Sequence, residues 1–342
     1  MDVPNRGGVF RIFNQTPEGG FMKKKLAALF ASTLLSASAF AQNFPERAVR
    51  VIVPFAPGGV VDIAARHVSE QLSQMWNESV MVENRPGGNG FIATTAAARA
   101  KPDGYTLLMA HTGEFSVNPA IFKNVPYDLD RDFVPVSLVS DTPLVLATKV
   151  DSPLNSVADV IKVSKEKPGS LTFSSPGTGS FNHLAGEWFA NAAQIQLMHV
   201  PYRGGSPAAA AVASGEVSLG VVAASSMDQF VKSGHVKILA VMTKRRIPTQ
   251  PDWPTLQDVG VPDVDAANWV GLFAPKGTPK DVLDKISRDV MAALKTEKLQ
   301  TAFSMGGGEA VGSTSDEFYK RIKRDLETNR AIAKRANVQV EQ

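Results

Sequence analysis

The sequence predicts an α/β protein with two lobes that are joined by two crossover strands. Short apolar runs rich in Val, Ile and Leu alternate with stretches of helical periodicity, which is the pattern of a sheet covered by helices. Two segments join a strand-like run to a proline-containing stretch, as crossover connections would. A hydrophobic content of 44% indicates well-formed cores rather than disorder.

The first 41 residues do not match a folded domain. Three lysines at 23–25 precede an apolar run at 26–35, and small residues follow at Ala39 and Ala41. A basic region, a short apolar region and two small residues are typical of a secretory signal peptide, and the apolar run is too short to span a bilayer. We therefore expect cleavage between Ala41 and Gln42.

Charge and cysteine content exclude several classes of protein. The formal net charge is +3, but residues 1–41 hold five Lys/Arg against two Asp/Glu, which leaves 31 of each in the rest of the chain. A neutral mature chain lacks the basic footprint of nucleic-acid binding. The absence of cysteine excludes disulfides, thiolate catalysis and a lipid-bearing membrane anchor. We expect a monomer in the periplasm, with Met22 as the initiator because the residues before it carry no export signal.

Strands and helices are expected in alternation. The strand-like runs share aliphatic and β-branched residues and cover 49–53, 79–82, 106–109, 144–147, 217–222 and 238–242. Apolar residues three or four apart predict amphipathic helices over 61–75, 282–294 and 316–336. The last of these helices also carries many basic residues, which we interpret as a solvated face.

Two crossover segments define the predicted lobes. They cover residues 144–153 and 269–279. If both are crossovers, residues 42–142 and 271–342 form one lobe and residues 143–270 form the other, with a cleft between them. The chain has no long low-complexity linker, so we expect a hinge made of two strands.

The first candidate ligand-binding loop lies between the strand at 49–53 and the helix that follows it. Its candidate residues are Phe55, Ala56, Pro57, Gly58 and Gly59. The first turn of a helix has unpaired N–H donors and a partial positive charge, so this loop suits an anion. The alternative is a tight turn in which Asp62 only caps the helix and pairs with Arg66.

A second loop repeats this design between a strand-like run at 171–173 and a helix expected from about Phe181 to Ala193. Its candidate residues are Ser175, Gly177, Thr178, Gly179 and Ser180. The hydroxyl groups of Thr178 and Ser180 can donate to a carboxylate, and the alternative is that Ser180 is an ordinary N-cap. Because the two loops fall in different predicted lobes, we expect one anion to be held across the cleft.

Two further turns are candidates for the wall of the cleft. A glycine-rich run after the second strand contains Asn89, which we consider a ligand contact, whereas we interpret Arg85 as paired with a neighbouring carboxylate. After another strand-like run, Tyr202 and Arg203 place an amphipathic ring and a cation where a wall would lie.

Enzyme motifs are absent from the sequence. Neither glycine-rich loop fits G-x-G-x-x-G, and no Walker A or G-x-S-x-G pattern occurs. Ser180, His183 and Glu187 can share one helix face, which leaves a nucleophile with its base or a metal pair as alternatives. No orienting partner or third ligand stands out, so we expect no catalysis, metal or cofactor. The other histidines, which we interpret as ordinary polar or core-edge residues, are His67, His111, His199 and His235.

Several motifs occur in series along the chain. They are Pro-Phe-Ala-Pro-Gly-Gly at 54–59, Glu-Asn-Arg-Pro-Gly at 83–87, Pro-Asp-Gly-Tyr-Thr-Leu at 102–107, Pro-Gly-Thr-Gly-Ser at 176–180 with His-Leu-Ala-Gly at 183–186, Val-Pro-Tyr-Arg-Gly at 200–204, and Ala-Pro-Lys-Gly-Thr-Pro at 274–279. In these motifs the chain resembles the Bug-type extracytoplasmic solute receptors of tripartite tricarboxylate transporters, over nearly the whole mature length.

The resemblance implies a two-lobed Venus-flytrap fold of the type II periplasmic-binding-protein class. It also implies a small carboxylate as ligand and the membrane subunits of such a transporter as partners. Carried over residue by residue, the carboxylate shell consists of Ala56, Gly58 and Gly59 from one lobe and Thr178 and Ser180 from the other. The resemblance further implies that Asp62 faces the variable end of the ligand, and that His183 and Tyr202 lie at the site.

Two departures from the family pattern bear on the ligand. The segment at 215–225 lacks an aspartate that is frequent there, which makes that wall less polar. Residues 111–115 replace a loop that is commonly rich in small hydroxyl residues; Thr112 is the ligand candidate there, and we expect Glu114 and Phe115 to narrow the pocket or repel a second carboxylate. Both departures favour a monocarboxylate over citrate.

Two other functions stay open at this stage. A sensor of the same fold would bind a carboxylate and dock on a membrane signalling partner without transport. A periplasmic hydrolase would use Ser180 as its nucleophile.

Overall fold

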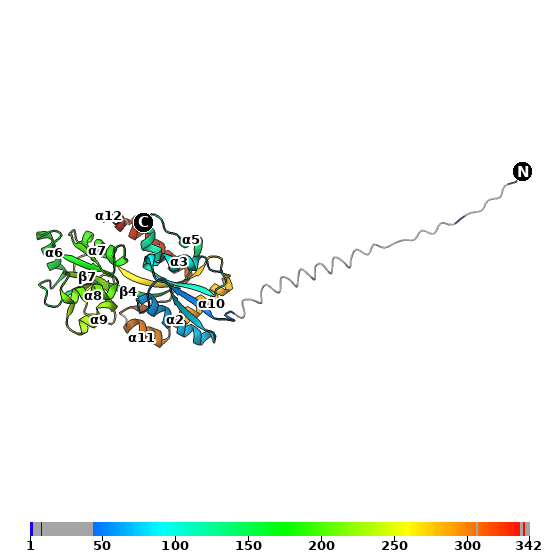
Figure 1. Cartoon of the computed structure of the whole chain (residues 1–342), viewed down its shortest axis with the longest axis horizontal. Coiled ribbons are helices and arrows are strands. Elements are labelled where there is room, and N and C mark those ends of the chain that lie inside the picture. The colour runs from blue at the N-terminus through cyan, green and yellow to red at the C-terminus, as the bar shows by residue number, and fades with distance from the viewer. Residues whose placement is uncertain (3–7, 9–43, 306, 336–337, 339–342) are drawn as a thin grey trace. The chain divides into compact units, whose positions relative to one another are not determined.

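The computed structural model describes residues 1, 2, 8, 44–305, 307–335 and 338. The chain divides into two units, Met1–Phe44 and Pro45–Gln342, and the helices and strands below belong to the second (Figure 1). The predicted signal peptide and its cleavage site between Ala41 and Gln42 lie outside the described residues. In the described part of the chain, no helix is long and apolar enough to cross a membrane.

Strands and helices alternate, as the sequence predicts. The strands are β1 (Val49–Val53), β2 (Val80–Asn84), β3 (Thr106–His111), β4 (Phe133–Lys149), β5 (Thr172–Ser175), β6 (Met198–Pro201), β7 (Leu219–Ala223), β8 (Val236–Val241), β9 (Ala267–Pro275) and β10 (Glu309–Ala310). The longer helices are α2 (Val60–Trp76), α3 (Phe91–Ala98), α6 (Val157–Glu166), α7 (Phe181–Ala192), α8 (Gly205–Ser214), α9 (Ala224–Lys232), α10 (Lys280–Leu294), α11 (Glu297–Met305) and α12 (Ser315–Arg335). Shorter turns of helix are η1 (Gly88–Gly90), η2 (Gly113–Val117), α4 (Asn118–Ile121) and α5 (Leu129–Asp132).

The strands form one mixed sheet in the order β2-β1-β3-β9-β4-β7-β5-β6, and β8 and β10 also pair with β4. The first strand set, β1 to β3, pairs in parallel, and so does the second strand set, β5 to β7. The antiparallel strands β4 and β9 lie between the two sets and connect them (Figure 1).

The long strand β4 makes the crossover. Its first part, Phe133–Pro143, pairs with β9, and its second part, Leu144–Lys149, pairs with β7 and β8. The sequence predicts a crossover here, and the strand-like run expected at 144–147 is part of a longer strand that begins at Phe133. Pro135 and Pro143 interrupt the apolar pattern, and the strand accommodates the first of them through a register shift. The division of the chain into lobes at 142/143 and 270/271 stays a prediction.

The register makes the carboxyl ends of the two strand sets face each other. Since β3 and β4 are both antiparallel to β9, the first set runs in the direction of β4, and the second set runs against it because β7 is antiparallel to β4. His111 at the end of β3 is level with Ser140 of β4, because both pair with Val270. Ala223 at the end of β7 pairs with Leu144, only four residues or roughly 13 Å further along β4.

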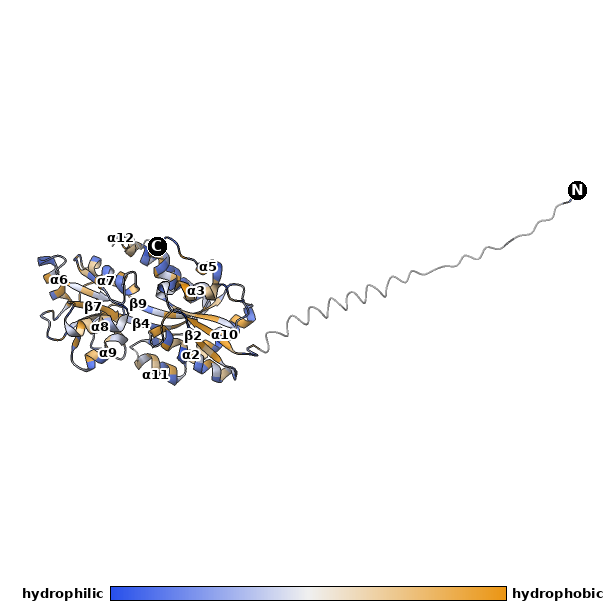
Figure 2. Cartoon of the chain, in the orientation of Figure 1, coloured by the Kyte–Doolittle hydropathy of each residue, from blue (hydrophilic) through white to orange (hydrophobic). Residues whose placement is uncertain are grey.

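Helices cover the sheet and bury its apolar side chains. A cluster of buried aromatic rings under the first set contains Phe115, Phe133, Trp269, Phe273 and Phe318. Figure 2 shows hydrophobic residues along the central strands and hydrophilic residues on the outer turns of the helices. Strands β4 and β9 are therefore anchored in a packed core, which leaves the loops at the carboxyl ends to carry function.

Candidate ligand-binding site

The first loop joins β1 to α2 at the carboxyl end of the first strand set. Gly58 adopts a positive φ of 88°, which suits glycine, and Gly59 begins the helix without a side-chain cap. In the part of the chain that the structure describes, the N–H groups of Gly59, Val60 and Val61 find no acceptor. Phe55 is half-buried and residues 56–60 are exposed, so the donors of Gly59 and Val60 lie at the open, positive end of α2, whereas Val61 is buried.

The side chain of Asp62 holds this loop in place through hydrogen bonds. Its side chain is buried, Oδ2 accepts from the Gly58 N–H and from Arg66 Nε, each at 2.9 Å, and Oδ1 accepts from Asn84 Nδ2 at 2.8 Å. Burial pushes the pKa of Asp62 up, but the hydrogen bonds from Arg66, Gly58 and Asn84 outweigh it and leave the pKa below its usual value. The pairing with Arg66 is confirmed, and these contacts give Asp62 a structural role. Its contact with a ligand stays a prediction.

The second loop joins β5 to α7 at the carboxyl end of the second strand set. Ser180 is the N-cap of α7, because its Oγ accepts from the His183 N–H at 3.2 Å. Thr178 is exposed, and no hydrogen bond of its hydroxyl occurs within the described residues. With the same scope, the N–H groups of Phe181 and Asn182 find no acceptor. The second loop thus offers a free hydroxyl and first-turn donors, as the first loop does.

A buried polar cluster supports the second loop. Ser175 is fully buried, and its Oγ lies 2.7 Å from His199 Nε2 and accepts from the Gly177 N–H at 3.2 Å. The Gly179 N–H donates to His183 Nδ1 at 3.2 Å. The imidazole rings of His183 and His199 stack with their centroids 3.8 Å apart. Strand pairing of β5 with β6 places His199, which the sequence indicates to be an ordinary polar or core-edge residue, half-buried beside His183.

This histidine pair is expected to make the free energy of unfolding depend on pH. Burial lowers the pKa of His183 to about 4, and burial together with the charge of His183 lowers the pKa of His199 to about 4. At a pH below 6.5, the ordinary pKa of histidine, these rings bind protons in the unfolded chain but stay neutral in the folded chain. We therefore expect urea denaturation to show a free energy of unfolding that falls as the pH drops from 6.5 toward 4.

A matched variant tests the assignment of this pH effect. His199→Gln keeps a polar contact for Ser175 but removes one titrating ring, so its loss of stability over this pH range should be smaller than that of the wild type. Burial raises the pKa of Glu187, which acts in the opposite direction, but that effect is common to both proteins and cancels in the comparison. Equal losses in the two proteins would contradict the role of the histidine pair.

The remaining candidates lie at other turns of the same two carboxyl ends. Asn89 is exposed with a positive φ of 50°, and its main-chain oxygen accepts from Asn118 Nδ2 at 2.9 Å. Thr112 is buried, and its Oγ1 accepts from the Trp269 N–H at 3.0 Å, which indicates a structural role. Arg85 pairs with Glu83 at 2.5 Å, as expected.

Tyr202 contacts the second loop through its main chain. Its N–H donates to the Ser175 carbonyl at 2.9 Å, and its hydroxyl donates to Glu216 Oε1 at 2.8 Å. Burial and the Glu216 carboxylate raise the pKa of Tyr202 to about 12, so the hydroxyl stays protonated. The ring is half-buried and its contact with a ligand stays a prediction.

His111, which the sequence indicates to be an ordinary polar or core-edge residue, lies beside the first loop. It ends β3, its side chain is 27% exposed, and its ring packs edge-on against Phe55 of the first loop with centroids 4.6 Å apart. The expectation that Glu114 and Phe115 narrow the pocket is wrong, because both side chains are buried. Glu114, three positions after His111, was the signal in the sequence for a contact between the two side chains, because residues three apart in a helical turn lie on the same side.

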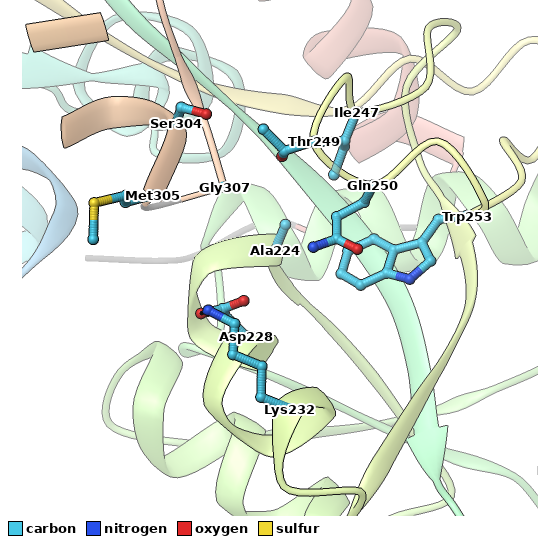
Figure 3. A pocket seen from close by; sticks show the side chains of 10 residues that line it. All are labelled: Ala224, Asp228, Lys232, Ile247, Thr249, Gln250, Trp253, Ser304, Met305 and Gly307. Atoms are coloured by element: carbon cyan, nitrogen blue, oxygen red, sulfur yellow. Dashed lines mark hydrogen bonds and ion pairs between the residues drawn. The ribbon is translucent and has the colours of Figure 1, made fainter. Parts of the chain in front are cut away.

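A separate cavity of about 210 Å³ lies beside α9 (Figure 3). Its wall includes Asp228 and Lys232 of α9, Trp253 of the segment between β8 and β9, and Met305 at the end of α11. Asp228 and Lys232 form an ion pair of 2.6 Å with each other. None of the predicted site residues lines this cavity, and the loops remain the better candidate because they combine unpaired donors with helix N-termini.

The nucleophile candidates of this region are buried or engaged in structural contacts. Within the described residues, no group of three His, Asp or Glu side chains is placed to hold a metal ion. Ser175 contacts a histidine but is fully buried, and Ser180 is engaged as a helix cap. Glu187 lies 3.9 Å from His183, too far for the hydrogen bond that orients a catalytic base.

Fold and site together define a receptor-like protein of the periplasmic-binding-protein class. A family model described as tripartite tricarboxylate transporter family receptor matches residues 64–338. The chain belongs to this family, which confirms the resemblance found in the sequence motifs.

Three solved structures illustrate the similarity. Periplasmic binding protein BugD is 33% identical, with a TM-score of 0.75 over 87% of this chain and 100% of that chain. Rpa4515 of R. palustris, solved with adipate, is 29% identical, with a TM-score of 0.80 over 87% and 100% of the two chains. MatC from Rhodopseudomonas palustris, solved with bound malate, is 27% identical, with a TM-score of 0.75 over 84% and 99%.

Proposed function

We propose that this protein is a periplasmic receptor that captures a small carboxylate between its first and second loops and delivers it to the membrane subunits of a tripartite tricarboxylate transporter. One carboxylate group would accept from the free N–H donors at the start of α2 and from the hydroxyl and first-turn donors at the start of α7. Contacts to both loops at once would favour a closed arrangement of the two predicted lobes.

The single observation that carries this proposal is the facing pair of loops with unpaired main-chain donors. Two helix N-termini directed at the same region attract an anion, and hydrogen bonds to a charged acceptor are stronger than those to a neutral one. Relatives solved with adipate and with malate support a carboxylate as the anion. Membership in a transporter receptor family supports the transporter as partner.

We further propose that the protein binds its ligand without chemical conversion. Conversion would need an accessible nucleophile beside an oriented base, whereas Ser175 is buried and Ser180 caps α7. The monomeric state, the export by a cleaved signal peptide and the lack of a membrane anchor belong to the same proposal.

A thermal-shift screen of the mature protein against mono-, di- and tricarboxylates tests the proposed function. A ligand that binds only the folded state raises the melting temperature, so at least one carboxylate class should give a shift that grows with concentration. Thr178→Trp should abolish the shift, because it fills the exposed side of the second loop without removing a hydrogen bond. Thr178→Ser keeps the hydroxyl and should retain the shift.

Two results would count against the receptor. One is the absence of any shift in a protein shown by mass spectrometry to carry no copurified ligand. The other is the appearance of a chemical product during incubation with a carboxylate ester or amide, which would favour the hydrolase instead.

A further inference from the structure

His111 and Glu114 form a pair whose chemistry the carboxylate clamp does not explain. Glu114 is fully buried, and its Oε2 lies 2.8 Å from His111 Nδ1 and accepts from the His111 main-chain N–H at 2.9 Å. Its other oxygen, Oε1, has no hydrogen-bond partner within the described residues. An added Cβ at Gly90 would overlap Oε1, so a glycine makes the space for this carboxylate.

The surroundings offer no cation to neutralise Glu114. Among the described residues, its only ion-pair partner is His111, and no lysine or arginine reaches it. The nearby N–H groups of Gly90 and Phe91 donate to main-chain oxygens of η1 and the turn before it, and Tyr127 donates to the main-chain oxygen of Glu114. A net negative charge on the pair would therefore be buried without compensation, which is costly.

The number of protons that the two side chains hold determines whether Nε2 of His111 carries a hydrogen. The 2.8 Å contact between Glu114 Oε2 and His111 Nδ1 requires one shared proton. If that were the only proton, the pair would carry a buried negative charge. A pair that is neutral overall carries a second proton, on Nε2, whether the shared proton lies nearer the carboxylate or the ring.

Nε2 lies on the side of the ring that a ligand can reach. The carboxylate of Glu114 is inaccessible, so the exposed 27% of His111 is the edge that faces away from it, beside Phe55. In the part of the chain described, Nε2 has no hydrogen-bond partner. The ring itself is fixed, because the Gly113 N–H donates to Nδ1 at 3.1 Å and an added Cβ at Gly113 would overlap the ring.

We infer that His111 determines specificity by donating Nε2–H to a second carboxylate of the ligand, with Glu114 as the residue that positions its ring. The cargo is then a dicarboxylate, with one end in the two loops, its carbon chain beside Phe55 and the other end at His111. This inference rests on the proposed receptor function. It replaces the expectation of a monocarboxylate, whose basis was a Glu114 that lines the pocket.

Titration calorimetry with length-matched acids tests this inference. The probes are succinate against butanoate, glutarate against pentanoate and adipate against hexanoate, because each pair differs only in the second carboxylate. We expect the wild type to bind at least one dicarboxylate about 10-fold or more tightly than its partner acid, as a charge-assisted hydrogen bond would give. In His111→Leu this ratio should fall toward one, and in the control His235→Leu, at an exposed histidine, it should not change.

Glu114→Gln tests the positioning role with a spectroscopic signature. A glutamine oxygen accepts the Nδ1 proton, so the neutral ring should lose its proton from Nε2, and ¹⁵N correlation spectra of the histidine side chain would report the change of tautomer. The preference for dicarboxylates should weaken together with that change. An unchanged tautomer with an unchanged preference for dicarboxylates would show that Glu114 does not position His111.

The outcomes separate this inference from the receptor function. Equal affinity for both acids of every pair, or a dicarboxylate preference that persists in His111→Leu, would overturn the role of His111 and leave the receptor intact. Failure of every acid to bind would contradict the receptor function itself, and this inference with it.

Discussion

Replacing Val60 with proline is expected to weaken carboxylate binding by at least about 10-fold while the fold stays intact. Proline lacks the N–H that the first residue of α2 would donate to the ligand, and its ring occupies the place of that hydrogen. The backbone tolerates the change, because proline suits the first position of a helix and Gly59, with φ of −79° and ψ of 166°, is already extended. Titration calorimetry with the best acid of the thermal-shift screen measures the effect.

Val60→Ala is the matched control for this substitution. It removes a side chain that is 38% exposed but keeps the N–H, so its affinity should stay within about twofold of the wild type. Wild-type affinity in Val60→Pro, with an unchanged melting temperature, would show that the start of α2 does not bind the ligand.

Replacing Arg321 with methionine is expected to lower the free energy of unfolding by about 3 kcal/mol. Arg321 lies on α12, and its Nη1 and Nη2 donate to the two oxygens of Asp141 in β4 at 2.5 and 3.0 Å. The two side chains are only 23% and 16% exposed. Without the guanidinium, Asp141 would keep a largely buried carboxylate with no partner at the point where β4 passes between the strand sets.

Urea denaturation measures this loss as a lower midpoint at an unchanged slope. Lys320→Met is the control on the same helix, because Lys320 is 72% exposed and pairs with an equally exposed Asp316, so its effect should be small. The double variant Asp141→Asn with Arg321→Met removes both charges and should recover part of the loss. Equal stability of Arg321→Met and Lys320→Met would show that the buried ion pair of Arg321 with Asp141 does not stabilise the fold.

The sequence predicts the features that depend on local pattern. Apolar spacing places α2, α10 and α12 within two residues of their observed ends, and the Pro/Gly loops before α2 and α7 are where the motifs indicate. Ser180 as N-cap and the pairing of Asp62 with Arg66 follow from short-range rules of helix starts.

Features set by strand register are not visible in the sequence. His183 and His199 meet only because β6 pairs with β5, and Arg321 reaches Asp141 across 180 residues of sequence. The basic face expected on α12 is accordingly not all solvated, since Arg321 turns inward. The side on which His111 and Glu114 lie depends on the turn of η2 after β3, which periodicity does not specify.

The most direct test of the central claim is a single titration followed by amide resonances of the deuterated protein. If one carboxylate bridges the two loops, the amide signals of Gly59 and Val60 in the first loop and of Phe181 and Asn182 in α7 should shift together, with one common midpoint. Shifts confined to one loop, or two distinct midpoints, would contradict a ligand held between them.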